Sequence, residues 1–268
     1  MCRARWLGRR YDPPRDMLTD LERERFREAS ETVFGGEGVD CGIGTLGERS
    51  LHRILKLYTD PCRENHEVSY LGYVVDVMNS DGITEVQTRD FARLLPKLSA
   101  FLRETRVTVI YPITRIRTLV WLDPKTGEAS KPRRSPKRGK PSDALPELSR
   151  LLPVIGNDRL TVKIFMLDTE DYKERNGRGR DRKHYATRYE RLPTELVDII
   201  ELNSRDDYRA LIPSGLADGF TSADFDRASS LRGMRAHFSL KFLLELGLLT
   251  REKEGRVYRY YRTEENKK

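Results

Sequence analysis

Hydrophobic residues recur along the chain with two periods, and each period predicts a different kind of element. In the first half, two segments have apolar residues at helical spacing. One begins near Thr45, a residue type common at N-caps, and is stopped by Asp60-Pro61. The other runs from Phe91 to Leu102 and gathers its apolar side chains on one face. We therefore predict two amphipathic helices that pack against a second layer.

Three short segments between these helices are predicted to be strands. They are residues 66–70, 72–78 and 83–88, and the middle one is a nearly continuous apolar run. The sequence Asn79-Ser80-Asp81-Gly82 predicts a tight turn between the second strand and the third. The two helices are therefore expected to flank a hairpin.

The chain continues with predicted strands at residues 107–112 and 118–122, a helix near 145–151 and a buried strand at 160–167. The complete order is helix, hairpin, helix, strand, strand, helix, strand. This order indicates an α/β domain with a mixed central sheet over residues 41–205.

Residues 1–40 are predicted to be an N-terminal extension outside this domain, flexible in one interpretation. One amphipathic helix is expected over about residues 14–34, before the break at Gly35-Gly36-Glu37-Gly38. Its charged string Glu22-Arg23-Glu24-Arg25 offers little apolar surface to bury. We assign this extension no function.

Residues 206–268 predict a second unit. Thr221 is expected to cap a short helix, and a second helix from Met234 ends at Gly247, a residue type typical of the position after a helix. A β-hairpin around Glu254-Gly255 follows, and residues 207–211 are the candidate for a preceding helix. Helix-turn-helix followed by a hairpin resembles a winged-helix domain.

The composition fits a charged protein that has a packed core. The chain has 268 residues, 37% of them hydrophobic and 34% charged, and a net charge of +8. A positive balance favours polyanions as partners, because cationic side chains displace the counterions of phosphates. Simple solubility explains the same composition equally well.

The cysteines and the apolar runs exclude several classes of protein. Cys2, Cys41 and Cys62 are far apart and form no CxxC pair, so neither a disulfide framework nor a zinc knuckle is predicted. No apolar run approaches the roughly 20 residues of a membrane span. The arginine-rich N-terminus lacks a following hydrophobic stretch, which argues against a secretory signal. We expect a cytoplasmic protein that does not contact a membrane.

Two acids and an amide on the predicted hairpin form the candidate chemical site. Asp76 lies near the end of the apolar strand, and Glu85 and Gln87 share a face of the next strand. Hairpin pairing can bring Asp76 beside them. Two neighbouring carboxylates repel each other unless a divalent cation lies between them, and such oxygen ligands suit Mg²⁺ or Mn²⁺. Ordinary surface carboxylates are the alternative interpretation.

This pattern resembles the PD-(D/E)xK nuclease superfamily, whose core is a helix, a hairpin bearing Asp…(Asp/Glu)-x-Lys, another helix and further strands. The match covers about residues 45–122. It implies a restriction-endonuclease-like core in which Asp76 and Glu85 hold the metal with the backbone carbonyl of Val86. Glu48 would be the acid that many members place on the first helix, where it ligates a second ion or acts as a base.

Gln87 departs from the superfamily pattern, because it occupies the position of the lysine. An amide can orient the attacking water but brings no positive charge. Lys97, on the following helix, is either a relocated cation or a solvated residue. We favour the solvated position, because its neighbours Leu94 and Leu98 are expected to face the core.

Other motifs are weaker. The GxGxxG sequence from Gly42 to Gly47 lacks the preceding buried strand of a dinucleotide site. The four histidines, His52, His66, His184 and His237, show no metal-ligand spacing.

Two basic segments and one helix are candidates for contact with nucleic acid. Basic segments are usually solvated loops, but two such loops on one core can also clamp a phosphate backbone. The exposed cations of the second C-terminal helix could enter a major groove. The candidates are Arg133, Arg134, Lys137, Arg138, Arg178, Arg180, Arg182, Lys183, Arg235 and Lys241.

The sequence thus predicts a magnesium-dependent endonuclease whose substrate is expected to be double-stranded DNA. A homodimer is compatible with the resemblance, since many nucleases of this kind dimerise to cut both strands. The alternative is a non-catalytic DNA-binding regulator that retains a nuclease-like scaffold, and an RNA-directed enzyme is a third hypothesis.

Overall fold

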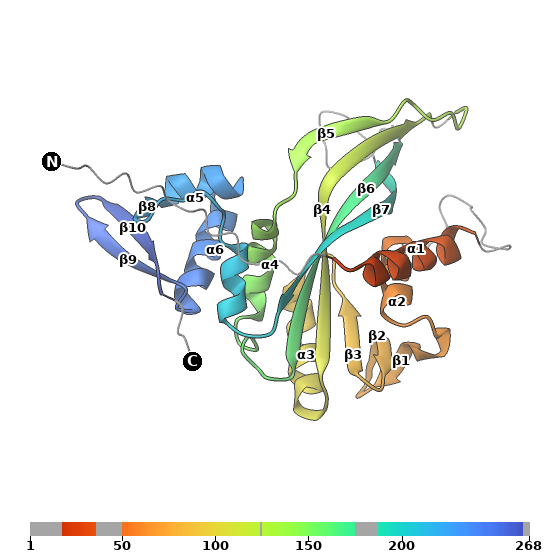
Figure 1. Ribbon diagram of the computed structural model, residues 1–268, viewed down its shortest axis with the longest axis horizontal. Helices are drawn as coiled ribbons and strands as arrows, with labels where there is room; N and C mark the ends of the chain where they lie inside the picture. The colour runs from red at the N-terminus through yellow and green to blue at the C-terminus, as the bar shows by residue number, and fades with distance from the viewer. Residues whose placement is uncertain (1–17, 36–49, 124, 175–186, 265–268) are drawn as a thin grey trace.

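A mixed sheet of seven strands forms the centre of the protein in the computed structural model, which describes residues 18–35, 50–123, 125–174 and 187–264 (Figure 1). The strand order is β1-β2-β3-β4-β6-β7, and β5 pairs with β4 outside this path. The β3–β4 and β4–β6 pairs are parallel, and the other pairs are antiparallel. The strands are β1 (His66–Tyr70), β2 (Tyr73–Asn79), β3 (Gly82–Val86), β4 (Val107–Leu122), β5 (Arg133–Arg138), β6 (Leu160–Glu174) and β7 (Thr187–Leu202). The predicted α/β class with a mixed sheet is confirmed.

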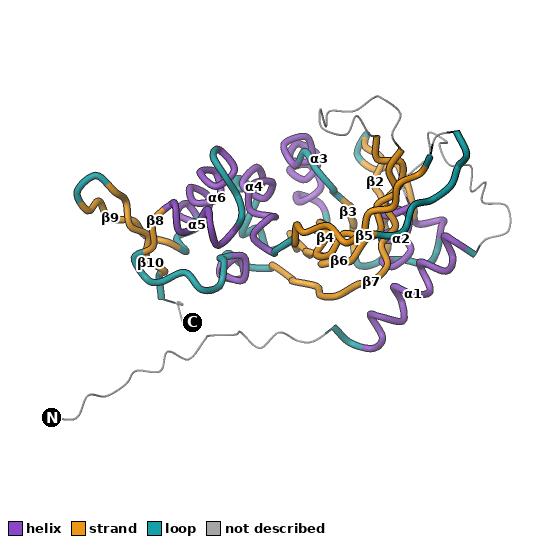
Figure 2. The backbone as a smooth tube through the Cα atoms, turned by 90° about the horizontal axis from the view of Figure 1, so that it is seen from above, coloured by secondary structure: helices purple, strands orange, loops and turns teal. Residues whose placement is uncertain are grey.

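Helices cover both faces of this sheet (Figure 2). The helices are α1 (Asp20–Phe34), α2 (Ser50–Thr59), α3 (Phe91–Glu104) and the short α4 (Leu145–Leu148). On β4, Val109 packs into the hydrophobic cluster that contains α3 and α4, whereas Ile110 packs into the cluster that contains α1 and α2. Successive side chains on a strand point to opposite faces, so one strand supplies both cores.

The first helix is part of the core, which corrects the prediction of an extension outside the domain. Phe26, Ala29 and Val33 are buried against α2 and the sheet. They lie at spacings of three and four residues, so one narrow apolar stripe is enough to dock the helix. The charged string from Glu22 to Arg25 does not prevent this docking, because only one residue in each turn has to be apolar.

The predicted break between residues 112 and 118 is absent, since β4 is continuous from Val107 to Leu122. Arg115 and Arg117 interrupt the apolar pattern of β4, which explains the break that we predicted there. Two strands were also missed: β5 lies in the first basic segment, residues 131–140, which we expected to be a loop, and β7 begins within the second, residues 173–191.

The C-terminal unit shares the main hydrophobic cluster with the sheet. Phe242 and Leu243 lie in the same buried cluster as Leu145 and Leu148. Thr221 caps a helix as predicted, because its hydroxyl accepts the N–H of Asp224. The elements are a 3-10 helix (Asp206–Leu211), β8 (Phe220–Thr221), α5 (Ser222–Ser229), α6 (Met234–Glu245), β9 (Leu249–Glu254) and β10 (Val257–Arg262). Within the described ranges, no helix is long and apolar enough to cross a membrane.

Candidate functional site

The structure brings Asp76 and Glu85 together where strands β2 and β3 stop pairing. Their ladder ends at the pair Val77 and Thr84. In the next position the Asp76 carboxylate accepts the backbone N–H of Val86 at 2.7 Å, and the N–H of Asp76 points to Glu85 Oε1 at 3.4 Å. Beyond the pair of Val77 and Thr84, hydrogen bonds to the two acidic side chains replace the backbone hydrogen bonds between β2 and β3. The two acids therefore lie in an opening between these strands.

His52 approaches Asp76 from helix α2. Its Nε2 lies 3.0 Å from Asp76 Oδ2, and both side chains are mostly buried. Burial acts to raise the pKa of Asp76, but the hydrogen bond and charge of His52, together with the Val86 N–H, outweigh it. The pKa of Asp76 therefore lies below its ordinary value, and the side chain is a carboxylate at neutral pH.

Glu85 has the opposite electrostatic character. It is only 4% exposed, and burial followed by repulsion from Asp76 raises the pKa of Glu85 to about 7. Lys97 opposes this rise, because its Nζ lies 2.7 Å from Glu85 Oε2. Adjacent acids whose pKa values are shifted in opposite directions are found most often at the functional sites of proteins.

Lys97 belongs to the site, so the favoured interpretation of a solvated residue is wrong. The side chain is 17% exposed, and its ammonium also donates to the carbonyl of Val74 and lies 5.7 Å from the ring centroid of Phe101. The signal was present in the sequence. Lys97 comes three residues after Leu94 and four before Phe101, which places it on the buried face of the helix.

Gln87 turns away from the two acids. Its amide nitrogen donates to the backbone carbonyls of Arg89 and Asp90, in the turn before α3. Val86 contributes its N–H to Asp76, and its own side chain is buried in the cluster of α1 and α2. Glu48 lies outside the described residues.

His52 was missed because it was tested only for metal-ligand spacing with other histidines. It lies three residues before the buried Leu55 and four before the buried Lys56, which places it on the inward face of α2, and contact with Asp76 depends on a pairing of helix and strand that no local pattern encodes.

Asp76 and Glu85 are the side chains at this opening that could hold a divalent cation. Two carboxylates from adjacent strands offer hard oxygen ligands, and their mutual repulsion is what a divalent cation relieves. The described ranges contain no group of three or more His, Cys, Asp or Glu side chains arranged to hold a metal. Magnesium keeps several waters and takes substrate phosphate as a ligand, so two protein carboxylates suffice.

The predicted nucleic-acid contacts fall on different elements. Arg133, Arg134, Lys137 and Arg138 are exposed on strand β5. Arg235 and Lys241 are exposed on α6, where Lys241 lies 3.5 Å from Glu245. The remaining four candidates lie outside the described residues: Arg178, Arg180, Arg182 and Lys183.

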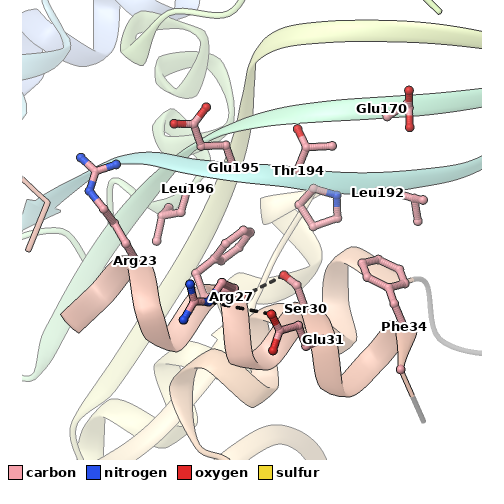
Figure 3. Close-up of a pocket in the computed structure, with 13 residues that line it drawn as sticks. Arg23, Arg27, Ser30, Glu31, Phe34, Glu170, Leu192, Thr194, Glu195 and Leu196 are labelled. Atoms are coloured by element: carbon pink, nitrogen blue, oxygen red, sulfur yellow. Dashed lines mark hydrogen bonds and ion pairs between the residues drawn. The ribbon is translucent and has the colours of Figure 1, made fainter. Parts of the chain in front are cut away.

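A groove of about 750 Å³ lies elsewhere, between α1 and β7 (Figure 3). Phe26, Phe34 and Leu196 line it, with Arg23 and Glu195 among the charged residues. None of the predicted site residues lines this groove, so the volume of a cavity does not identify the candidate site in this protein.

The matched family has the description "Domain of unknown function (DUF8091)", and its model covers residues 49–203. The chain belongs to this family. The DUF8091 segment contains His52, Asp76, Glu85 and Lys97, and it ends before the C-terminal unit. A relative from Treponema pallidum (strain Nichols), described as "Uncharacterized protein", is 30% identical over 220 residues, which span 81% of this chain and 86% of the relative. No solved structure matches the chain.

Proposed function

We propose that this DUF8091 protein is a metal-dependent endonuclease that hydrolyses phosphodiester bonds in DNA. The observation that carries the proposal is the meeting of Asp76, Glu85 and Lys97 at one opening in the sheet. Two acids and a lysine are the side chains of the PD-(D/E)xK motif, and here they come together although Gln87 stands in the lysine position of the sequence.

The order of elements also supports the proposal. Helix α2 precedes the antiparallel strands β1, β2 and β3, and α3 then leads into β4, which runs parallel to β3. The superfamily core has the same order of helix, hairpin, helix and further strand. Asp76 and Glu85 lie on its second and third strands, as the resemblance implies.

Each side chain has a definite task in this proposal. Asp76 and Glu85 hold the ion, and His52 and the Val86 N–H fix the orientation of Asp76. When bound, Mg²⁺ supplies Lewis-acid stabilisation of charge on the phosphate. Lys97 provides the positive charge that the strand lysine provides in the superfamily, where it polarises the attacking water and stabilises charge on phosphorus.

Double-stranded DNA is the substrate that the charged surfaces favour. Strand β5 presents four exposed cations, and α6 presents Arg235 and Lys241 beside the β9–β10 hairpin. Neutralising phosphates releases counterions and contributes much of the binding free energy. We propose that the C-terminal unit is a winged helix that grips the duplex while the acid pair cuts it.

A specific observation favours a second candidate, a non-catalytic DNA-binding regulator that retains the scaffold. The amide of Gln87 donates to Arg89 and Asp90 instead of facing the acids, so it does not orient a water there. In this alternative, Lys97 replaces the metal by neutralising Glu85 permanently.

Cleavage assays test the first candidate. Plasmid DNA, linear duplex, single-stranded DNA and RNA are each incubated with Mg²⁺, Mn²⁺ or EDTA. We expect metal-dependent cleavage of duplex DNA that Asp76→Ala and Glu85→Ala abolish and that Lys97→Met lowers by about 100-fold. Lys163→Met is the matched control, because it breaks a Lys–Glu pair of similar length, 2.8 Å to Glu201, away from the acids. If the wild type cuts none of these substrates with either metal, the enzymatic proposal fails.

Calorimetric titration with Mn²⁺ separates the two candidates. A nuclease binds the ion with an affinity that Asp76→Ala and Glu85→Ala remove. A regulator whose Lys97 has replaced the metal shows no saturable binding at millimolar Mn²⁺, and it still binds DNA in EDTA.

A further inference from the structure

The ends of strands β4, β6 and β7 extend beyond the helices with β5 beside them (Figure 1). This part of the sheet contains a second charged cluster, built on Asp171. The carboxylate of Asp171 is 1% exposed and accepts Arg191 Nε at 2.6 Å and Arg191 Nη2 at 2.8 Å. Arg117 approaches the same carboxylate, with Nε 3.2 Å from Asp171 Oδ2.

The neighbouring ion pair, Arg115 with Asp168, is an arrangement in which every charge has one partner of opposite charge. Arg115 and Asp168 form a two-point pair at 2.8 and 2.7 Å, and Asp168 also accepts the N–H of Ile116. One arginine therefore faces one aspartate, and the charges balance.

The Asp171 cluster differs in two respects. Two guanidinium groups share one carboxylate, and within the described residues Arg117 makes no hydrogen bond, although its Nε is buried. A guanidinium has five N–H donors, and a buried donor without an acceptor costs free energy. About a third of the Arg117 side chain is exposed, so the donors of its guanidinium group other than the buried Nε can reach a ligand from solvent.

The electrostatics of the cluster favour an anion. Burial, followed by the nearby charge of Arg191, holds the pKa of Arg117 below its ordinary value, against the attraction of Asp171. An anion bridging the two guanidinium groups would relieve their repulsion and accept the free donors of Arg117. The planar guanidinium group binds phosphate through two parallel hydrogen bonds, which makes phosphate a well-matched ligand.

We infer that Arg117 and Arg191, oriented by Asp171, form a binding site for a backbone phosphate of nucleic acid. The polymer is favoured over a single phosphate because β5 lies next to β4 and adds a row of exposed cations, with Arg133 opposite Leu119 and Arg134 opposite Thr118. The inference rests on the proposed function in taking nucleic acid as the ligand, but it does not require cleavage.

Fluorescence anisotropy tests the site with a fluorescein-labelled DNA duplex in EDTA, so that no cleavage contributes. We expect Arg117→Gln and Arg191→Gln each to weaken binding by about tenfold. Each should also lower the slope of log affinity against log salt concentration by about one, as for the loss of one phosphate contact. Arg115→Gln is the matched control and should change affinity less than twofold, because Asp168 neutralises Arg115 one to one, whereas Arg191 shares the single carboxylate of Asp171 with Arg117. Circular dichroism checks that each variant is folded, and Arg117→Lys, which keeps the charge but loses the planar fork of donors, replaces Arg117→Gln if that variant is not.

Wild-type affinity and salt slope in both Arg117→Gln and Arg191→Gln would overturn the site. An equal loss in Arg115→Gln would also overturn it, because the effect would then follow net charge alone. Competition with inorganic phosphate distinguishes the two ligand sources. If Arg117→Gln weakens phosphate binding but leaves duplex binding unchanged, the site holds a free anion and the inference about nucleic acid is wrong. An active nuclease whose binding is unaffected by Arg117→Gln would refute this site alone, whereas Arg117-dependent binding without cleavage would refute the nuclease alone.

Discussion

Lys97 reaches Glu85 across 2.7 Å from helix α3, so the positive charge at the acid pair comes from a helix and not from the strand that carries Glu85. The ammonium is held by the carbonyl of Val74 as well. A lysine fixed at two points stays beside the acids whatever occupies position 87. The relationship explains how Gln87 can turn away without leaving Glu85 unpaired.

The raised proton affinity of Glu85 predicts that stability falls as pH rises. Its pKa is about 7 in the folded protein, against an ordinary value of 4.5. The folded state therefore binds the proton more tightly, and this contribution is fully present below pH 4.5 and lost as pH rises through 7. The full effect is about 3 kcal/mol at most. Urea denaturation between pH 4.5 and 8 measures it.

Glu85→Gln isolates this effect, because glutamine has a similar shape and does not titrate. We expect the variant to be more stable than wild type at pH 8 and to lose the decline between pH 5 and 8. Glu201→Gln, at the half-exposed partner of Lys163, is the control and should leave the decline in place. A wild-type profile that rises with pH over this range would contradict the assignment to Glu85.

Metal binding should raise the melting temperature, and more so at higher pH. Mg²⁺ requires the carboxylate form of Glu85, which is complete only above pH 7, so affinity should increase from pH 6 to pH 8. Ligands that bind only the folded state stabilise it in proportion to the logarithm of their concentration. Thermal melts over a range of Mg²⁺ concentrations at both pH values measure this. An equal shift in Asp76→Ala would place the ion elsewhere.

The sequence was informative wherever a local pattern coincides with a buried face. The run Tyr73–Val77 and the turn at Asn79–Gly82 predicted the hairpin, and register then placed Asp76 beside Glu85. Strand β7 was not predicted, because mixed polar and apolar residues can pair at a sheet edge without any periodic signal.

Contacts between elements that are far apart in the sequence could not be predicted from local hydrophobic patterns. His52 meets Asp76 through the docking of α2 on the sheet, and Arg117 and Arg191 both reach Asp171 because β4 and β7 pair with opposite edges of β6. The spacing of these residues along the chain predicts neither contact. The position of Lys97 could have been predicted, since it lies three residues after Leu94 and therefore on the buried face of the helix. We predicted a solvated side chain because lysine is usually exposed.

The packing of α1 predicts that its apolar stripe stabilises the protein. Phe26 is buried against α2 and its ring lies 6.5 Å from that of Tyr58, so Phe26→Ala should cost about 3 to 5 kcal/mol. Leu21 is 63% exposed on the same helix, and Leu21→Ala should change stability by less than about 0.5 kcal/mol. Chemical denaturation of the two variants compares them. Similar small effects in both would restore the idea of a detached N-terminal extension.

The shared core predicts that the sheet and the C-terminal unit unfold together. Leu243 of α6 is fully buried in the same cluster as Leu148 of α4, so Leu243→Ala should destabilise by about 2 to 5 kcal/mol. The chain has two tryptophans, and in a Trp6→Phe background the fluorescence of Trp121 on β4 reports the sheet alone. If the core is continuous, Leu243→Ala lowers the midpoint of the Trp121 transition as much as that of the helical signal in circular dichroism. A Trp121 midpoint that stays at the wild-type value while the helical signal is lost earlier would instead establish two independent domains, with the acid pair and the proposed DNA grip free to unfold separately.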